Sequence, residues 1–160
     1  RIPLGEYLTT LTDQLQRSFR EAAAHVRLRV EADNLSVPAT IAMPCGMIVT
    51  ELVTNAFKYA YPSGAKGPLV IRLASGEGSF LLSVSDEGVG LPAEFDLRQS
   101  SSFGLQLVAN LADQLGARLT RPPGIGTEIV LEVPLPSSAA EPERPRGSAA
   151  QPLHQSESIL

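Results

Sequence analysis

Residues 51–62 read ELVTNAFKYAYP, and this stretch combines an apolar face with a row of polar side chains. Positions three and four residues apart return to nearly the same side of a helix, so Glu51, Asn55 and Lys58 share one side. The side predicted to pack against a sheet is apolar and carries Val49, Val53, Ala56 and Ala60, flanked by Leu52 and Phe57. We call Glu51, Asn55 and Lys58 the polar row. Taken alone, such a row is more typical of a solvated helix face than of a site.

Length and composition limit the class of protein. The chain has 160 residues, 43% of them hydrophobic, which is enough for one buried core and one domain. A net charge of -4 provides no basic surface of the kind that a phosphate backbone requires, so we expect no nucleic-acid partner. The single cysteine, Cys45, lies in the apolar context MPCGMIV and is predicted to be a core residue in a reducing compartment.

The sequence contains no uninterrupted apolar run long enough to span a membrane. Its first residues do not show the basic and then apolar pattern of a signal peptide. We therefore expect a cytoplasmic chain that makes no membrane contact. The chain begins at Arg1 rather than Met, as a fragment of a longer protein would.

Hydrophobic periodicity predicts the secondary structure along the chain. The predicted elements are a helix at 3–24, a strand at 26–32, a helix from after Pro38 to Tyr61 with a kink near Pro44 and Gly46, strands at 69–74 and 80–85, a helix at 103–116, and strands at 117–120 and 127–133. Gly116 suits a left-handed helix cap.

Hairpins dominate this order of elements, which favours an α+β fold over a doubly wound one. We expect a two-layer α/β sandwich at residues 1–136, with a mixed, mostly antiparallel five-stranded sheet and three helices on one face. Residues 137–160 are rich in Ser, Pro, Glu and Arg and are predicted to be a disordered tail. Residues 93–102 are polar and unpatterned, as a mobile lid would be.

The sequence DEGVGL begins where the second strand of a predicted hairpin ends. Gly88 and Gly90 would let a flat ligand lie against the backbone while Asp86 accepts a hydrogen bond from it. A carboxylate acceptor suits the 6-amino group of adenine and opposes the 6-carbonyl of guanine. An ordinary Asp-Gly turn explains the motif equally well, whereas a calcium loop is excluded because its further acidic positions are missing.

A third motif, SSSFG at residues 100–104, precedes the helix at 103–116. Its serines are good helix caps, and its glycine exposes backbone amides that could also bind an anion. The sequence contains no GxxxxGK[ST], and Gly124-Ile125-Gly126 lacks the third glycine and the helix of a dinucleotide site. Those nucleotide folds are therefore excluded.

In order, ELVTNAFKYAYP, DEGVGLP, SSFGLQLVANLADQLGARL and GIGTEIVLEVP resemble the N, G1 and G2 boxes and the closing strand of the GHKL (Bergerat) ATP-binding fold. The resemblance is to the catalytic domain of bacterial sensor histidine kinases, in particular the HWE-like subgroup, and covers about Leu4 to Pro134. It implies that the chain binds ATP and Mg2+.

The resemblance also implies roles at the base end of the nucleotide. Asp86 would hold the adenine amino group, and Thr127 would assist through water. Gly88 and Gly90 would shape the floor of the pocket.

At the phosphate end, the resemblance implies that Asn55 coordinates Mg2+. Glu51 would orient a metal-bound water or act as a base, and Lys58 would meet the phosphates. Gly104 and Leu105 would approach the phosphates from the third helix.

Two positions depart from the family pattern. Tyr59 stands in the nucleotide site where histidine is usual, which leaves no assigned proton or phosphate role there. Ser102 replaces the first glycine of the stricter G2 box. Neither change removes adenine or magnesium binding.

The resemblance also implies that the chain would phosphorylate a histidine on a separate dimerisation domain, from which the helix at 3–24 would lead in, and would serve a downstream response regulator. Neither His25 nor His154 lies in the phosphoacceptor pattern. We therefore expect this chain not to phosphorylate itself on histidine. Two alternatives are a stand-alone anti-sigma-type serine kinase and a nucleotide-binding interaction module without transfer activity. The intact Asp86, Asn55 and loop glycines argue against the second.

Overall fold

The computed structural model describes residues 1–92, 95–99 and 102–137. The predicted tail lies outside this range except for Ser137, as do His154 and part of the predicted lid.

The described chain contains four α-helices, a 3-10 helix and seven strands. The helices are α1 (Leu4–Ser18), α2 (Arg20–Ala23), α3 (Ala39–Tyr59), η1 (Leu97–Gln99) and α4 (Phe103–Gln114). The strands are β1 (Ile2–Pro3), β2 (Val26–Ala32), β3 (Ser36–Val37), β4 (Gly67–Ser75), β5 (Ser79–Asp86), β6 (Arg118–Thr120) and β7 (Thr127–Pro134).

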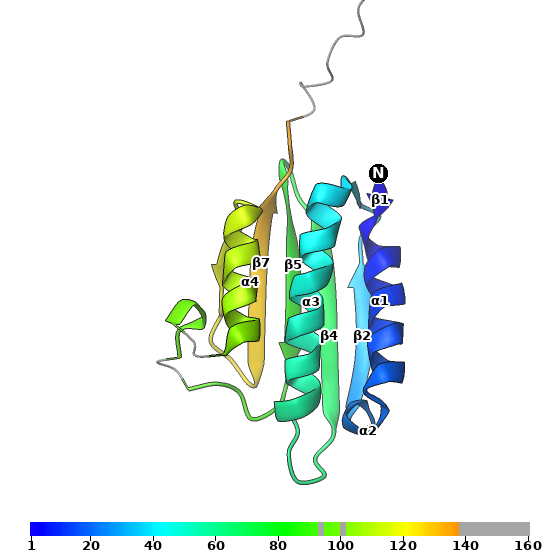
Figure 1. Cartoon of the computed structure of the whole chain (residues 1–160), viewed down its shortest axis with the longest axis vertical. Coiled ribbons are helices and arrows are strands. Elements are labelled where there is room, and N and C mark those ends of the chain that lie inside the picture. The colour runs from blue at the N-terminus through cyan, green and yellow to red at the C-terminus, as the bar shows by residue number, and fades with distance from the viewer. Residues whose placement is uncertain (93–94, 100–101, 138–160) are drawn as a thin grey trace, which may run out of the picture.

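Five of the strands form one sheet in the order β2-β4-β5-β7-β6. The β2 and β4 strands are parallel, and the other three pairs are antiparallel. The three long helices lie side by side over one face of this sheet (Figure 1). The predicted two-layer sandwich with a mixed, mostly antiparallel sheet is therefore confirmed, as is the left-handed cap at Gly116, which has φ +63°.

The helix predicted at 3–24 is wrong in one respect, because it is broken into α1 and α2. Phe19 leaves the helical region with φ -112° and ψ 39°, and its ring packs against Phe57 of α3 with the centroids 6.4 Å apart. Strands β1 and β3, which pair through Ile2 and Val37, were not predicted. A two-residue strand is too short to show a periodic pattern.

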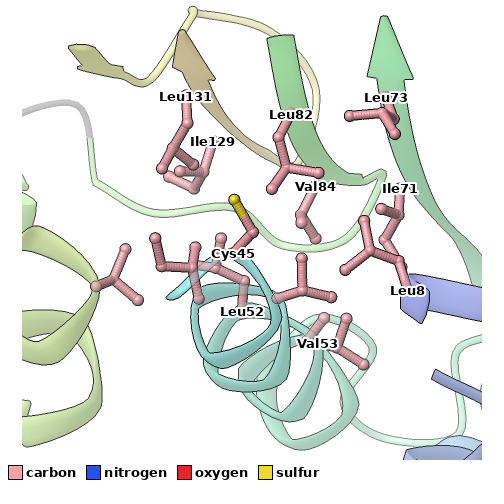
Figure 2. Packing of buried hydrophobic residues seen from close by; sticks show 14 of the residues in the cluster. Leu8, Cys45, Leu52, Val53, Ile71, Leu73, Leu82, Val84, Ile129 and Leu131 are labelled. Carbon is pink, nitrogen blue, oxygen red and sulfur yellow. The ribbon is translucent and has the colours of Figure 1, made fainter. Parts of the chain in front are cut away.

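Helix α3 is the centre of the core (Figure 2). Cys45, Val49 and Val53 are fully buried, which confirms the predicted apolar face and the core position of the cysteine. Pro44 lies inside the helix and is buried. By length and composition α3 could cross a membrane, but 61% of its most apolar window is buried between the other elements of this fold.

The elements that carry the sequence motifs meet at one end of the sandwich. The last turns of α3, the end of β5, the start of β7 and the start of α4 lie there, and the N-terminus lies at the opposite end (Figure 1). This arrangement places residues 51–62 beside the DEGVGL loop.

Candidate functional site

A cavity of about 370 Å³ opens between α3, the end of β5 and the start of α4. Six of the residues predicted to bind the nucleotide line it: Asn55, Tyr59, Asp86, Gly90, Leu105 and Thr127. These residues come from α3, β5, α4, β7 and the loop after β5, and are brought together only by the fold.

Asp86 is the acidic side chain of this cavity. Its Oδ1 accepts hydrogen bonds from the Gly88 amide at 2.9 Å and from the Thr127 amide at 3.3 Å. No group in the described part of the chain donates to Oδ2. Burial raises the pKa of Asp86 and is only partly offset by the two amide hydrogen bonds. One carboxylate oxygen is thus held by the backbone and the other is available to a ligand.

The two glycines of DEGVGL allow backbone to approach backbone. A side chain at Gly88 would collide with the Ala60 carbonyl, next to the hydrogen bond from the Val89 amide to that carbonyl (3.0 Å). Gly90 has φ +72°, and a Cβ there would lie 2.8 Å from the Gly126 carbonyl oxygen. Gly90 lines the cavity, whereas Gly88 fixes the loop onto the end of α3.

The side of α3 that faces the cavity differs from the predicted polar row. Asn55 lines the cavity, but Glu51 and Lys58 do not, and Lys58 is exposed. From α3 and its C-cap the cavity is lined by Leu52, Asn55, Ala56, Tyr59 and Ala60, so Asn55 is the one member of the polar row that reaches it.

Glu51 contacts the start of α4 instead. Its Oε2 occupies the space that a side chain at Gly104 would fill. The missing side chain at Gly104 therefore lets a carboxylate lie against the N-terminal turn of α4, next to Asn55 one helical turn away. Gly104 itself does not line the cavity.

Most of the remaining lining is apolar and was not predicted as part of a site. It consists of Leu52, Ala56, Ala60, Val84, Val89, Leu91, Phe95, Leu97 and Ile129, with Ser102 as a polar member. Several of these residues were assigned to the core, and they serve the core and the cavity at once. Val89 and Leu91 alternate with the glycines of DEGVGL, and this pattern could have predicted that they line the cavity.

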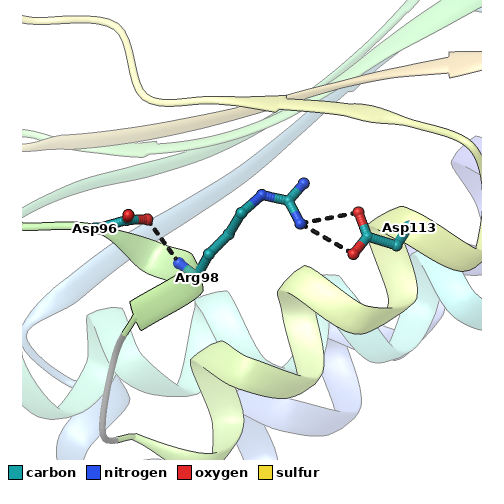
Figure 3. A network of polar contacts seen from close by, with 3 residues as sticks. All are labelled: Asp96, Arg98 and Asp113. Atoms are coloured by element: carbon teal, nitrogen blue, oxygen red, sulfur yellow. Dashed lines mark hydrogen bonds and ion pairs between the residues drawn. The ribbon is translucent and has the colours of Figure 1, made fainter.

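The predicted lid is attached to the fold at its described residues. Leu97 is buried, and Arg98 forms a two-oxygen ion pair with Asp113 of α4 at 2.9 Å (Figure 3). Arg121 donates to the Pro92 carbonyl at 2.9 Å and lies 6.0 Å from the centre of the Phe95 ring. Phe95 and Leu97, two large apolar residues in an otherwise polar segment, could have predicted that the segment packs on the fold.

A mixed, mostly antiparallel sheet covered by helices on one face, with a mostly apolar cavity and one acidic residue at the end of a central strand, defines the class of ATP-binding catalytic domains found in histidine kinases. Residues 9–132 match the family described as histidine kinase-like ATPase domain. The chain belongs to this family, and the resemblance drawn from its motifs is confirmed.

Similar proteins include sensor kinases. The chain is 33% identical over 137 residues to blue-light-activated histidine kinase 2 of Erythrobacter litoralis, covering 84% of this chain and 39% of that protein. It is 41% identical over 95 residues to the sensor histidine kinase PdtaS of Mycobacterium tuberculosis, covering 56% of this chain and 19% of that protein. The chain therefore spans well under half the length of these relatives.

The chain is also similar to one solved kinase structure and to an anti-sigma factor. The histidine kinase domain of the Erythrobacter litoralis EL346 blue-light-activated kinase superposes with a TM-score of 0.75 at 30% identity, over 84% of this chain and 62% of that chain. The anti-sigma F factor of Halalkalibacterium halodurans is 29% identical over 103 residues, covering 58% of this chain and 69% of that protein.

Proposed function

We propose that the chain binds ATP with Mg2+ in this cavity and transfers the γ-phosphoryl group to a histidine on a separate dimerisation domain. The observation that carries the proposal is Asp86. One of its oxygens is held by two backbone amides, and the other has no donor among the described residues, at the end of a mostly apolar cavity. An unsatisfied acceptor in such a place is what a ligand amino group would complete.

Adenine suits this end of the cavity because its exocyclic amino group can donate to Oδ2 of Asp86. The apolar lining provides surfaces for the purine ring, and the exposed Tyr59 side chain lies at the edge. Thr127 pairs with Asp86 across β5 and β7 and would support the same contact.

The residues at the other end fit Mg2+. The amide oxygen of Asn55 and the carboxylate of Glu51 are hard oxygen donors one helical turn apart, near the start of α4. No group of three His, Cys, Asp or Glu side chains that could hold a metal occurs within the described ranges. The metal would be held mainly by phosphate oxygens and water, as Mg2+ usually is, with Asn55 as the protein ligand. When bound, Mg2+ would neutralise charge on the phosphates.

The protein's contribution to transfer is positioning and electrostatic. The amides at the start of α4 and the glycine at 104 would approach the phosphates, and the exposed Lys58 would meet them. Transfer breaks the bond between the γ-phosphorus and the bridging oxygen, forms a P-N bond to the acceptor imidazole, and releases ADP and a proton.

The wider setting follows from the same proposal. The acceptor histidine would belong to a dimerisation domain of the same kinase, and the phosphoryl group would pass to a response regulator. The catalytic reaction would take place in the cytoplasm, where ATP is present, without membrane contact by these residues.

Binding is tested first by calorimetric titration with a non-hydrolysable ATP analogue, with and without Mg2+. Asp86→Ala should weaken binding under both conditions. Asn55→Ala should weaken mainly the Mg2+-dependent part. Unchanged affinity in both variants would contradict the proposed site.

Transfer is tested by adding labelled ATP and Mg2+ to the chain together with the dimerisation domain from the same gene. Acid-labile, alkali-stable phosphate on that domain is the expected product, and none should form on the chain alone. Acid-stable phosphate on a serine of an added protein would instead favour the anti-sigma-type kinase, which the similarity to anti-sigma F factors keeps as the second candidate. Nucleotide binding without any transfer would favour an interaction module.

A further inference from the structure

Tyr61 connects the ends of β4 and β5 beside the cavity. Its hydroxyl donates to the Pro68 carbonyl at 2.6 Å and accepts from the Glu87 amide at 2.9 Å. In the antiparallel register Leu69 is opposite Asp86, so Pro68 and Glu87 are the next pair beyond the last rung. The tyrosine hydroxyl therefore bridges the Glu87 amide and the Pro68 carbonyl just beyond the last rung of the β4–β5 ladder.

Gly67, which has no side chain, leaves room for this ring. The ring of Tyr61 occupies the position that a side chain at Gly67 would take. Burial raises the pKa of Tyr61, so its hydroxyl remains a donor at neutral pH. Both hydrogen-bonding functions of the oxygen are satisfied at the same time.

Three consecutive amides of the loop after β5 are fixed in this way. The Glu87 amide binds Tyr61, the Gly88 amide binds Asp86, and the Val89 amide binds the Ala60 carbonyl. Two of the three partners come from the two residues that follow α3. The peptide that leaves Asp86 is therefore fastened to the end of that helix.

We propose that Tyr61 is a positioning residue for base recognition: its hydroxyl holds the peptide after Asp86 and so orients Oδ2 toward the amino group of adenine. This inference rests on the proposed function, because it assumes that Asp86 recognises a 6-amino purine. Tyr61 does not line the cavity and acts through Asp86.

The test compares two ligands in one variant. Tyr61→Phe keeps the ring and removes only the hydroxyl. ADP and purine riboside 5′-diphosphate, which lacks the 6-amino group, are titrated calorimetrically in the presence of Mg2+. We expect Tyr61→Phe to weaken ADP about fivefold to tenfold and purine riboside diphosphate less than about twofold.

The ratio of the ADP affinity to the purine riboside diphosphate affinity distinguishes a positioning role of Tyr61 from an effect on folding stability. A smaller folded fraction weakens both ligands by the same factor and leaves their ratio unchanged. Tyr7→Phe is the matched control, because Tyr7 packs against the core near Gly46, toward the other end of α3, and should alter neither affinity. Equal losses for the two ligands, or no loss for ADP, would overturn the inference.

The wild-type protein distinguishes this inference from the function on which it rests. If wild type binds both ligands equally, the proposed recognition by Asp86 fails. If wild type prefers ADP and Tyr61→Phe retains the full preference, only the role of Tyr61 fails. Faster hydrogen exchange at the Glu87 amide in Tyr61→Phe should accompany the lost preference.

Discussion

Asp86 and Thr127 are paired across β5 and β7, and the Thr127 amide donates to Oδ1 of Asp86 at 3.3 Å. The two residues are 41 positions apart in the sequence. The start of the last long strand therefore closes the pocket around the acidic residue that ends a central strand. Any change that shifts β7 relative to β5 will reach the carboxylate directly.

Asp86→Asn should separate binding from stability. We expect nucleotide affinity to fall by about 1 to 3 kcal/mol, roughly fivefold to 150-fold, because the acceptor that faces the amino group is lost. The free energy of unfolding at pH 7 should be equal to or above that of wild type, because Asn avoids the burial of a charge while its oxygen can still accept the Gly88 amide. Calorimetric titration and urea unfolding measure the two effects.

The sign of the pH dependence follows from the raised pKa of Asp86, whose ordinary value is 3.8 and whose main perturbation is burial. Between 3.8 and the raised folded-state pKa, the folded protein holds more protons than the unfolded chain, so stability falls as pH rises through that window. The advantage of Asp86→Asn over wild type should therefore vanish below pH 3.8. A larger advantage in acid than at pH 7 would contradict this assignment.

Gly104→Ala should affect magnesium-dependent binding more than folding. The added methyl group would displace the Glu51 carboxylate, which is the movable end of a side chain, and alanine is favoured over glycine in a helix by up to about 1 kcal/mol. We expect unchanged or higher thermal stability and weaker binding of the ATP analogue when Mg2+ is present. Asn110→Ala, on an exposed position of the same helix, is the control and should leave binding unchanged.

Gly126→Ala and Gly124→Ala form a matched pair in the β6–β7 loop. Gly126 has φ +71°, and a side chain there would collide with the Asp86 carbonyl, so alanine should cost at least about 2 kcal/mol of unfolding free energy. Nothing lies within 4 Å of a side chain at Gly124, where the effect should stay within about 0.5 kcal/mol. Urea unfolding of both variants gives the comparison, and equal costs would contradict the backbone contact.

Cys45 should be inert in the folded protein. It is fully buried, and burial raises the pKa of its thiol to about 12, so almost no thiolate exists at neutral pH. We expect alkylation by iodoacetamide only at the rate of unfolding, with full labelling in denaturant. Mass spectrometry after timed labelling measures this, and rapid reaction under native conditions would contradict the core position.

Local pattern was a reliable guide where elements are long. The alternation in Val26–Ala32 and the helical spacing through Ala39–Tyr59 predicted these elements because each repeats one period several times. The break at Phe19 had no such signal, because it accompanies a contact with Phe57, 38 positions later. Strands β1 and β3 have two residues each, which is likewise too short to show a periodic pattern.

The sequence by itself determined the core face of α3, the hairpins, and the motif residues that identify the family, because these depend on residue type and local spacing. Only the tertiary structure decided which side of α3 faces the cavity: Asn55 and Tyr59 line it, whereas Glu51 and Lys58 do not. It also joined Tyr61 to Glu87 and Asp86 to Thr127. The physical reason is that a helix's rotation about its axis and the register between strands are set by packing across the whole core, to which distant residues contribute.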